Sequence, residues 1–244
     1  MLYPRFFAPD IRSDDPRLTL SATESQHLAR VLRLGAGDRV RVFDGRGGEY
    51  DAAIEVVSHR ATVLRLEGTV SPLSEALVPV TLAQALLKGD SMDAVIRDAT
   101  MLGVTRIVPM ITNRTNVAMR RVTTGKARGR WQRVALASAK QCGRAYVPLI
   151  EPTESLDVVL KSEAGLRLVL AEPALHAPRT RLPQPDARGA VLIVGPEGGW
   201  APDEIELAHI HGWVSWSIVP WILRAEAVAL TALSVLQYEW NRRP

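Results

Sequence analysis

Two short segments near the carboxyl end of the chain contain the residue types best suited to chemistry. The first, Gly195–Gly199, reads GPEGG and follows the apolar run Val191–Val194, in which three of four residues are β-branched. Glycine lets a backbone approach a ligand closely and adopt positive φ. The spacing lacks the glycines of a dinucleotide fingerprint and the lysine of a P-loop. We therefore expect a nucleoside-like ligand held mainly by backbone atoms, although a bare tight turn would have the same pattern.

A second segment, Ile218–Glu226, repeats this arrangement further along the chain. It continues the apolar run Trp213–Val219 and leads into a long apolar helix, with Arg224 and Glu226 at the junction. Because burying an isolated charge is costly, charged side chains at such a junction are expected to be paired or functional. Glu226 in a first helical turn would also be a favourable partner for the helix dipole, so a purely structural role stays open.

The chain around these segments alternates between strand and helix patterns. Strands are expected at Val78–Ala85, Arg106–Ile111, Val147–Ile150, Leu166–Ala171, Val191–Val194 and Trp213–Val219. Helices are expected at Ser91–Leu102, Gly125–Cys142 and Ser155–Glu163, from Pro202 onward, and at Ala225–Trp240. This alternation predicts an α/β fold with a parallel sheet covered on both faces. Ligands of open α/β sheets bind at the carboxyl ends of the strands, where both segments would lie.

Residues 1–71 are expected to form a separate β-rich unit, followed by a linker at Ser71–Glu75 and an α/β domain over residues 76–244. Short strands are expected at Arg5–Ala8, Val40–Phe43, Tyr50–Val57 and Ala61–Val70. Ser21–Glu24 is a capping-box signal for a helix start. That helix would present one apolar face made of His27, Leu28, Val31 and Leu32. The strand pattern resembles a small barrel more than a sandwich.

The last helix, Ala225–Trp240, is apolar on nearly every side. A helix without a polar face is expected to be buried. It would lie either in the core or in a dimer interface, and we favour the interface because a terminal helix is seldom enclosed by its own chain.

Composition excludes several classes of protein. The 244 residues are 47% hydrophobic and 23% charged, enough for one large domain or for a small and a medium one. No apolar run reaches the roughly 18 residues of a membrane span, and the first residues lack the apolar core of a secretory signal. Cys142 is the single cysteine, which excludes a cysteine-based zinc site and indicates the cytoplasm. The five histidines lack the spacing of a metal site, so no metal is expected.

Positive charge is concentrated in one stretch, although the formal net charge is only +4. Ala99–Ile150 contains no acidic residue. Its basic residues are Arg106, Arg114, Arg120, Arg121, Lys126, Arg128, Arg130, Arg133, Lys140 and Arg144. A long stretch of one sign attracts polyanions, most often nucleic acid. A solvated helix face with a basic loop would give the same sequence, so both interpretations stay open.

The two opening segments resemble motifs of a known family. Leu192–Trp200 (LIVGPEGGW) and Ile222–Glu226 (ILRAE) resemble the RsmE family, the bacterial 16S ribosomal RNA uracil-N3 methyltransferases of the SPOUT class. The resemblance covers nearly the whole chain, with further matches at Arg5–Phe7, His27–Arg33, Gly37–Val40, Leu87–Asp93, Leu102–Val104 and Lys140–Arg144. It implies a PUA-like RNA-binding barrel over residues 1–71 and a SPOUT domain with a C-terminal trefoil knot over residues 76–244. It also implies a homodimer formed through the C-terminal knot helix.

The resemblance further implies S-adenosylmethionine as cofactor and 16S ribosomal RNA, or the small ribosomal subunit, as partner. The cofactor would be held by Leu170, Val194, Gly195, Pro196, Glu197, Gly198, Gly199, Ile218, Val219, Ile222 and Leu223. RNA would be bound by Arg5, Arg30, Arg33, Lys88, Arg114 and Arg144. During methylation of uracil N3, Arg224 would stabilise the anion, and Glu197 or Glu226 would be the general base. No membrane contact is implied.

The second segment departs from the family pattern. Val219 replaces a glycine, Trp221 replaces a cation and Ala227 replaces a threonine. A β-branched residue tolerates positive φ poorly, so Val219 would strain a loop built for glycine. These departures leave open a protein of a different class, an RNA-binding or assembly protein on the same scaffold with an impaired cofactor pocket.

Overall fold

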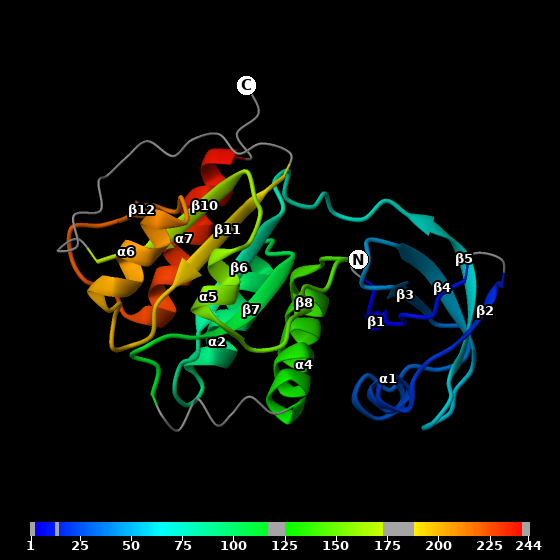
Figure 1. Ribbon diagram of the computed structural model, residues 1–244. Helices are drawn as coiled ribbons and strands as arrows, with labels where there is room; N and C mark the ends of the chain where they lie inside the picture. Colours follow the sequence, from blue (N-terminus) through cyan, green and yellow to red (C-terminus); the bar gives the residue numbers. More distant parts are fainter. Residues whose placement is uncertain (1–2, 13–14, 117–124, 173–187, 241–244) are drawn as a thin grey trace. The chain divides into compact units, whose positions relative to one another are not determined.

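The computed structural model describes residues 3–12, 15–116, 125–172 and 188–240. The chain divides into two compact units, which Figure 1 shows in sequence colours. Unit 1 comprises residues 1–75 and 139–147, and unit 2 comprises residues 76–138 and 148–244. The expected linker ends where unit 2 begins. The sequence does not foresee the return of residues 139–147 to unit 1, because they continue a helix, α4 (Gly125–Cys142), that begins in unit 2.

Unit 1 is built on a five-stranded sheet with the strand order β1-β3-β4-β5-β2. Its strands are β1 (Arg5–Phe7), β2 (Arg17–Thr19), β3 (Arg39–Phe43), β4 (Glu49–Val56) and β5 (Val63–Val70). β1 runs parallel to β3, and the other pairs are antiparallel. Alternate residues face a common core, so Val40 and Val42 are buried, while Arg39 is exposed and Arg41 is half-buried. The predicted strands are confirmed to within a few residues, but β2 was not predicted because its alternation lasts only three residues.

The helix of unit 1, α1 (Ala22–Gln26), begins where the sequence predicts. The Ser21 hydroxyl accepts a hydrogen bond from the backbone N–H of Glu24 at 3.3 Å, which satisfies one free donor of the first turn. The Glu24 carboxylate instead accepts hydrogen bonds of 2.7 and 2.9 Å from Nζ of Lys140. This ion pair joins two segments of unit 1 that lie far apart in the sequence.

Beyond α1 the helix changes pitch. Residues His27–Val31 form the π-helix η1, in which the N–H of Leu32 donates to the carbonyl of His27 at 3.1 Å. The extra residue in this turn rotates everything after it by about 100° relative to an α-helix. Leu28 is therefore fully buried, whereas Val31 and Leu32 are 66% and 39% exposed. The prediction of one apolar helical face is wrong for Val31 and Leu32.

Unit 2 contains a seven-stranded parallel sheet with the order β12-β10-β11-β6-β7-β8, in which β9 also pairs with β7. The bounds are β6 (Val80–Ala85), β7 (Arg106–Ile111), β8 (Leu149–Ile150), β9 (Glu154–Ser155), β10 (Leu166–Leu170), β11 (Ala190–Val194) and β12 (Val214–Trp216). Every pairing is parallel, so the carboxyl ends of all strands lie at one edge. The predicted parallel α/β sheet is confirmed. The two-residue strand β9 was not predicted, because it lies where the sequence indicates a helix start.

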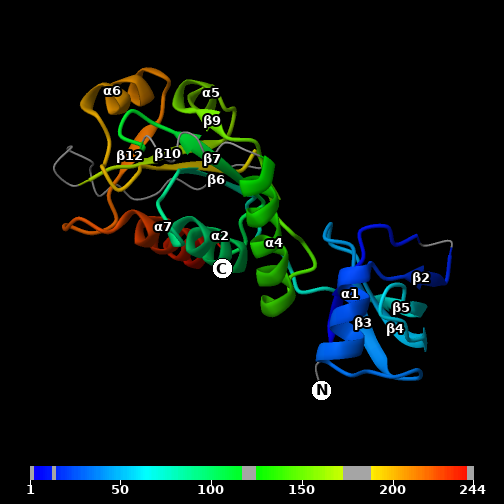
Figure 2. The ribbon, with the colours of Figure 1, turned by 90° about the horizontal axis from the view of Figure 1, so that it is seen from below.

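Helices cover both faces of this sheet (Figure 2). α5 (Leu156–Leu160) and α6 (Pro202–Ile210) lie on one face, and α2 (Ser91–Met101) and α7 (Ala225–Trp240) lie on the other. All residues of β11 are buried, as expected for a strand covered on both sides. The core under α5 and α6 includes Ala83, Leu160, Val169, Ile193, Trp200, Ala208 and Trp213. This packing holds the strand ends of the sheet, and with them the two loops, in fixed positions.

Candidate cofactor pocket

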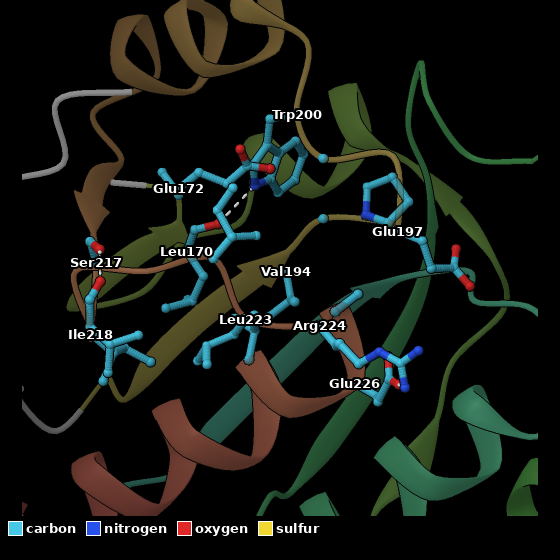
Figure 3. Close-up of a pocket in the computed structure, with 18 of the residues that line it drawn as sticks. Leu170, Glu172, Val194, Glu197, Trp200, Ser217, Ile218, Leu223, Arg224 and Glu226 are labelled. Atoms are coloured by element: carbon cyan, nitrogen blue, oxygen red, sulfur yellow. Dashed lines mark hydrogen bonds and ion pairs between the residues drawn. The ribbon is translucent and has the colours of Figure 1, made fainter. Parts of the chain in front are cut away.

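A cavity of about 540 Å³ lies at the carboxyl ends of β10, β11 and β12. Leu170, Val194 and Trp216, the last residues of these three strands, contribute to its wall. The first loop, Gly195–Gly199, and the second loop, Ile218–Arg224, form most of the rest (Figure 3). Its place in the fold is the one predicted for a ligand site at strand ends.

The predicted cofactor residues converge on this cavity. Those that line it are Leu170, Val194, Gly195, Pro196, Glu197, Gly199, Ile218, Val219, Ile222 and Leu223. Gly198 is the exception among the predicted set. It faces away toward Arg114, whose Cβ would lie 3.1 Å from a Cβ built on Gly198. The structure thus brings together residues that are separated by more than fifty positions in the sequence.

Hydrogen bonds with other parts of unit 2 hold the first loop. The backbone N–H of Lys88 donates to Oε1 of Glu197 at 2.9 Å, and Nη1 of Arg114 donates to the carbonyl of Gly198 at 3.2 Å. Gln84, fully buried in β6, donates from Nε2 to the carbonyls of Ala85 at 3.1 Å and Gly195 at 3.4 Å. These contacts connect the loop to β6 and to the segments that follow β6 and β7.

Trp200 fixes the loop against β10. Its side chain is 4% exposed, and Nε1 donates to the carbonyl of Leu170 at 2.8 Å. A Cβ built on Gly195 would lie 3.1 Å from two atoms of the Trp200 ring, so only glycine leaves room for the indole. Gly199 has φ +69°, and a Cβ there would collide with Oε1 of Glu172. Packing therefore favours glycine at position 195, and both packing and φ favour it at position 199.

The second loop is more exposed than the first. Trp221 and Ile222 are 64% and 72% exposed on the rim of the cavity. Among the described residues other than glycine, Arg33 alone has a positive φ. Val219 therefore suffers none of the backbone strain expected from its replacement of a glycine. The departure at this position leaves the cavity intact.

Three charged candidates for chemistry lie on the same side of the view in Figure 3: Glu197, Arg224 and Glu226. Arg224 is 88% exposed, and its Nη1 lies 3.8 Å from Oε1 of Glu226, whose side chain is 31% exposed. This separation allows only a weak, solvent-screened ion pair. Arg224 is therefore paired only weakly, and its side chain can turn toward a ligand without leaving a strong partner.

Sequence reasoning missed further residues of the site, among them Glu172, Ser217 and Trp200. Glu172 lies two residues beyond the end of β10, and its carboxylate has no partner among the described residues. Polar residues immediately after the carboxyl end of a parallel strand are a known signal of a ligand site. Trp200 could have been recognised as a large aromatic residue whose N–H needs an acceptor when buried.

Two of the six predicted RNA-binding residues are occupied inside unit 1. Nε of Arg5 donates to Glu49 at 2.8 Å, and its other nitrogens donate to the carbonyls of residues 139, 140 and 144. Arg144 donates to the carboxylate of Glu75 through Nε and Nη2. The side chains of Arg5 and Arg144 are 7% and 9% exposed. In this arrangement both arginines stabilise unit 1, and neither presents its guanidinium to a phosphate.

The other four predicted RNA-binding residues remain accessible. Arg30, Arg33, Lys88 and Arg114 are all exposed. Arg30 and Arg33 lie on and beside η1 in unit 1, while Lys88 and Arg114 flank the first loop in unit 2.

Much of the long basic stretch is neutralised by acids from elsewhere in the chain. Arg106 binds Glu151, and Arg130 binds Asp90 and Asp93. The hydrogen bond and charge of Asp93, with a smaller contribution from Asp90, raise the pKa of Arg130 above its ordinary value. Arg120 and Arg121 lie outside the described residues. The uniform charge of the sequence therefore overstates the charge available to a polyanion.

The described residues lack two features that some classes of protein have. They contain no helix long and apolar enough to cross a membrane. They also contain no group of three or more His, Cys, Asp or Glu side chains able to hold a metal ion.

A parallel sheet with a cavity at its strand ends, lined by two loops that carry both apolar and charged side chains, defines a ligand-binding α/β domain. A family model described as an RNA methyltransferase domain matches residues 74–237, and one described as an RNA methyltransferase PUA domain matches residues 20–67. The chain is 34% identical over 243 residues to the ribosomal RNA small subunit methyltransferase E of Synechocystis, which covers 96% of this chain and 77% of that protein. The chain therefore belongs to the RsmE family of ribosomal RNA methyltransferases.

Two solved structures share the whole architecture. The ribosomal RNA small subunit methyltransferase E of Neisseria gonorrhoeae, bound to S-adenosylmethionine, has a TM-score of 0.87 at 27% identity, with 98% of each chain covered. A Legionella pneumophila methyltransferase in complex with S-adenosylmethionine has a TM-score of 0.86 at 31% identity, again with 98% of each chain covered. The likeness extends over both units of the chain.

Proposed function

We propose that this protein transfers a methyl group from S-adenosylmethionine to N3 of a specific uridine in 16S ribosomal RNA. The observation that carries the proposal is the convergence of the two loops and three strand ends on one cavity. Both solved relatives described above have S-adenosylmethionine bound, according to their descriptions. Membership of the RsmE family supports the ribosomal substrate.

The residues of the cavity fit this cofactor. Its volume of about 540 Å³ falls within the range of small-molecule sites. Leu170, Val194 and Leu223 offer an apolar wall for an adenine ring. Glu172, without a partner among the described residues, offers a carboxylate to a ligand that carries both a sulfonium and an ammonium group. A buried or half-buried carboxylate gains most from such a cation where water is excluded.

When bound, the cofactor supplies an electrophilic methyl group, so the protein must orient the uracil and manage the N3 proton. Glu226 takes this proton as general base. Arg224 stabilises the negative charge that develops on a uracil oxygen. The exposure of Arg224 and its weak ion pair with Glu226 suit this role, because its guanidinium can pair with the substrate at little cost.

Glu197 is the weaker candidate for the base. Its carboxylate already accepts a hydrogen bond from the backbone N–H of Lys88. This contact fixes the carboxylate to the segment that follows β6. We assign Glu197 to holding the first loop and Glu226 to proton transfer.

The finer architecture belongs to the same proposal. We assign RNA binding to a PUA-like domain over residues 1–71 and methyl transfer to a SPOUT domain over residues 76–244. The second loop and α7 would form a trefoil knot. A homodimer through α7 would cover Leu230 and Tyr238, which are 41% and 64% exposed, and the exposed rim of the second loop. The cytoplasm, where ribosomal RNA is modified, is the expected location.

RNA contact is proposed for Arg30, Arg33, Lys88 and Arg114. All four are exposed, and none is held by a carboxylate among the described residues. Arg5 and Arg144 contribute instead by keeping unit 1 folded.

Two experiments test the proposal. Calorimetry measures binding of S-adenosylmethionine, and a methyl-transfer assay uses small-subunit RNA, with the product mapped by mass spectrometry. Methylation at N3 of one uridine is expected. Glu226→Gln should abolish methyl transfer without changing cofactor affinity, whereas Glu197→Gln should mainly weaken cofactor binding. Failure to bind the cofactor at millimolar concentration would sink the enzyme assignment and leave the RNA-binding protein as the function.

A further inference from the structure

An unusual surface lies at the end of the helix in unit 1, over residues Arg30–Arg33, which we name the η1 tip. Two aliphatic side chains, Val31 and Leu32, are 66% and 39% exposed there. They are flanked by Arg30 and Arg33, both exposed and both without a hydrogen-bond or ion-pair partner among the described residues. Two apolar side chains therefore lie between two basic ones over four consecutive positions.

The backbone departs from ordinary helical geometry to produce this surface. In an α-helix, Val31 and Leu32 would share the buried face of Leu28, three and four residues earlier. The π-helical turn closed by Leu32 and His27 moves them outward. Isolated π-turns inside helices are uncommon and occur frequently at functional sites. The cost of leaving two aliphatic residues in water is therefore built into the fold.

A second departure follows at once. Arg33 has φ +54° and is the one described non-glycine residue with positive φ. The N–H of Leu34 donates to the carbonyl of Leu28, six positions earlier, at 3.2 Å, which closes the end of the helix around the left-handed residue. Leu34 then packs against the core of unit 1.

Glycine is the residue that this backbone position favours, because a Cβ is strained in the left-handed region. A purely structural cap would therefore be served better by glycine than by arginine. Strained residues persist where the surrounding structure holds them for a function. Arginine at position 33 therefore lowers local stability relative to glycine, and its side chain is the only feature that glycine would lack.

We propose that the η1 tip is an RNA-reading element in which Val31 and Leu32 contact bases while Arg30 and Arg33 bind the flanking phosphates. This rests on the proposed function for the identity of the RNA. Positive charge on both sides of the aliphatic pair matches a nucleic acid, whose phosphates flank the apolar faces of its bases. Contact with the nucleobases adds to the binding free energy a contribution that does not depend on salt, unlike the contribution from the phosphate contacts.

Two variants, compared with a matched control, separate contacts with bases from contacts with phosphates. Val31→Ser with Leu32→Ser removes the aliphatic pair, and Arg33→Gly removes a charge while relaxing the backbone. The matched control is Val56→Ser with Val57→Ser, which alters an aliphatic pair of similar exposure, 55% and 38%, in the same unit. Binding is measured to in vitro transcribed 16S ribosomal RNA and to heparin, a polyanion without bases, over a range of salt concentrations.

The Val31 and Leu32 double variant should bind the RNA about tenfold more weakly, with an unchanged salt dependence and unchanged heparin binding. Arg33→Gly should keep or raise Tm. It should weaken binding to both the RNA and heparin, and it should reduce the slope of log K against log salt by about 1. Arg33→Lys should restore most of the affinity. The Val56 and Val57 control should bind both ligands as the parent protein does.

Several outcomes would overturn the proposal. One is an RNA affinity of the Val31 and Leu32 variant equal to that of the control, and another is an equal loss toward heparin. A loss seen only with assembled small subunits, and not with naked RNA, would mean that the tip contacts a ribosomal protein. Full RNA affinity of Arg33→Gly would reduce Arg33 to a structural cap. Cofactor calorimetry is run in parallel, so a failed methyltransferase assignment is seen separately from a failed η1 tip.

Discussion

Trp200 connects the first loop to the end of β10, and removing its indole N–H tests whether this connection shapes the cofactor pocket. Its Nε1 donates to the carbonyl of Leu170 at 2.8 Å in a buried setting. Trp200→Phe leaves that carbonyl without a donor, which costs about 1–3 kcal/mol. The smaller ring also leaves a void, at about 1 kcal/mol. We expect the free energy of unfolding to fall by about 2–4 kcal/mol in total.

Trp213→Phe provides a matched control on the same face of the sheet. Nε1 of Trp213 donates to the carbonyl of Leu160 at 3.0 Å, and the side chain is 3% exposed. Trp213 does not line the cavity, whereas Trp200 and Leu170 both do. The two variants should therefore lose similar stability in urea denaturation, with unchanged m-values.

Cofactor binding should distinguish the two variants. Calorimetry should find S-adenosylmethionine bound about tenfold more weakly by Trp200→Phe, equivalent to about 1.4 kcal/mol, and unchanged in Trp213→Phe. Unchanged affinity in Trp200→Phe would refute the idea that this hydrogen bond positions the pocket. Equal weakening in both variants would also refute it, because affinity would then follow overall stability.

Three further predictions concern the pocket and unit 1. Gly195→Ala should lower cofactor affinity about tenfold in calorimetry, since its Cβ would lie 3.1 Å from the ring of Trp200. Glu172→Gln should weaken binding of S-adenosylmethionine but not of S-adenosylhomocysteine, which lacks the sulfonium charge; equal weakening of both would contradict an interaction of Glu172 with the sulfonium. Lys140→Met should lower the free energy of unfolding by about 3 kcal/mol by stranding Glu24, and adding Glu24→Leu should recover most of it, as measured by urea denaturation.

Local patterns predicted the parts of the fold that local physics decides. The buried run Val191–Val194 and the glycines after it predicted a strand and a ligand loop, because an apolar run followed by GPEGG allows few other structures. The helix start at Ser21 was predicted from its capping residues, and the structure confirms it. Each of these features depends on residues within a few positions of one another.

Features that depend on distant partners could not be predicted in this way. The ion pair of Arg5 joins it to Glu49, which lies 44 positions away, and no local pattern indicates this partner. The outward turn of Val31 depends on one π-type hydrogen bond that leaves no mark in the hydrophobic periodicity. Glu172 becomes part of the site only because the ends of β10 and β11 are neighbours in the sheet.

The two loops of the pocket are held in different ways, and this explains where the sequence departs from the family pattern. The first loop is tied to elements distant in sequence through Glu197, Gly198 and Trp200, so most changes there would disturb several contacts at once. In the described part of the chain, the second loop is held by local hydrogen bonds, such as that from the Ser217 hydroxyl to the carbonyl of Val219 at 3.0 Å. A locally held, exposed loop can change residues and adjust its backbone without moving its neighbours. Val219 accordingly has no positive φ, and the cavity is present without the expected glycine.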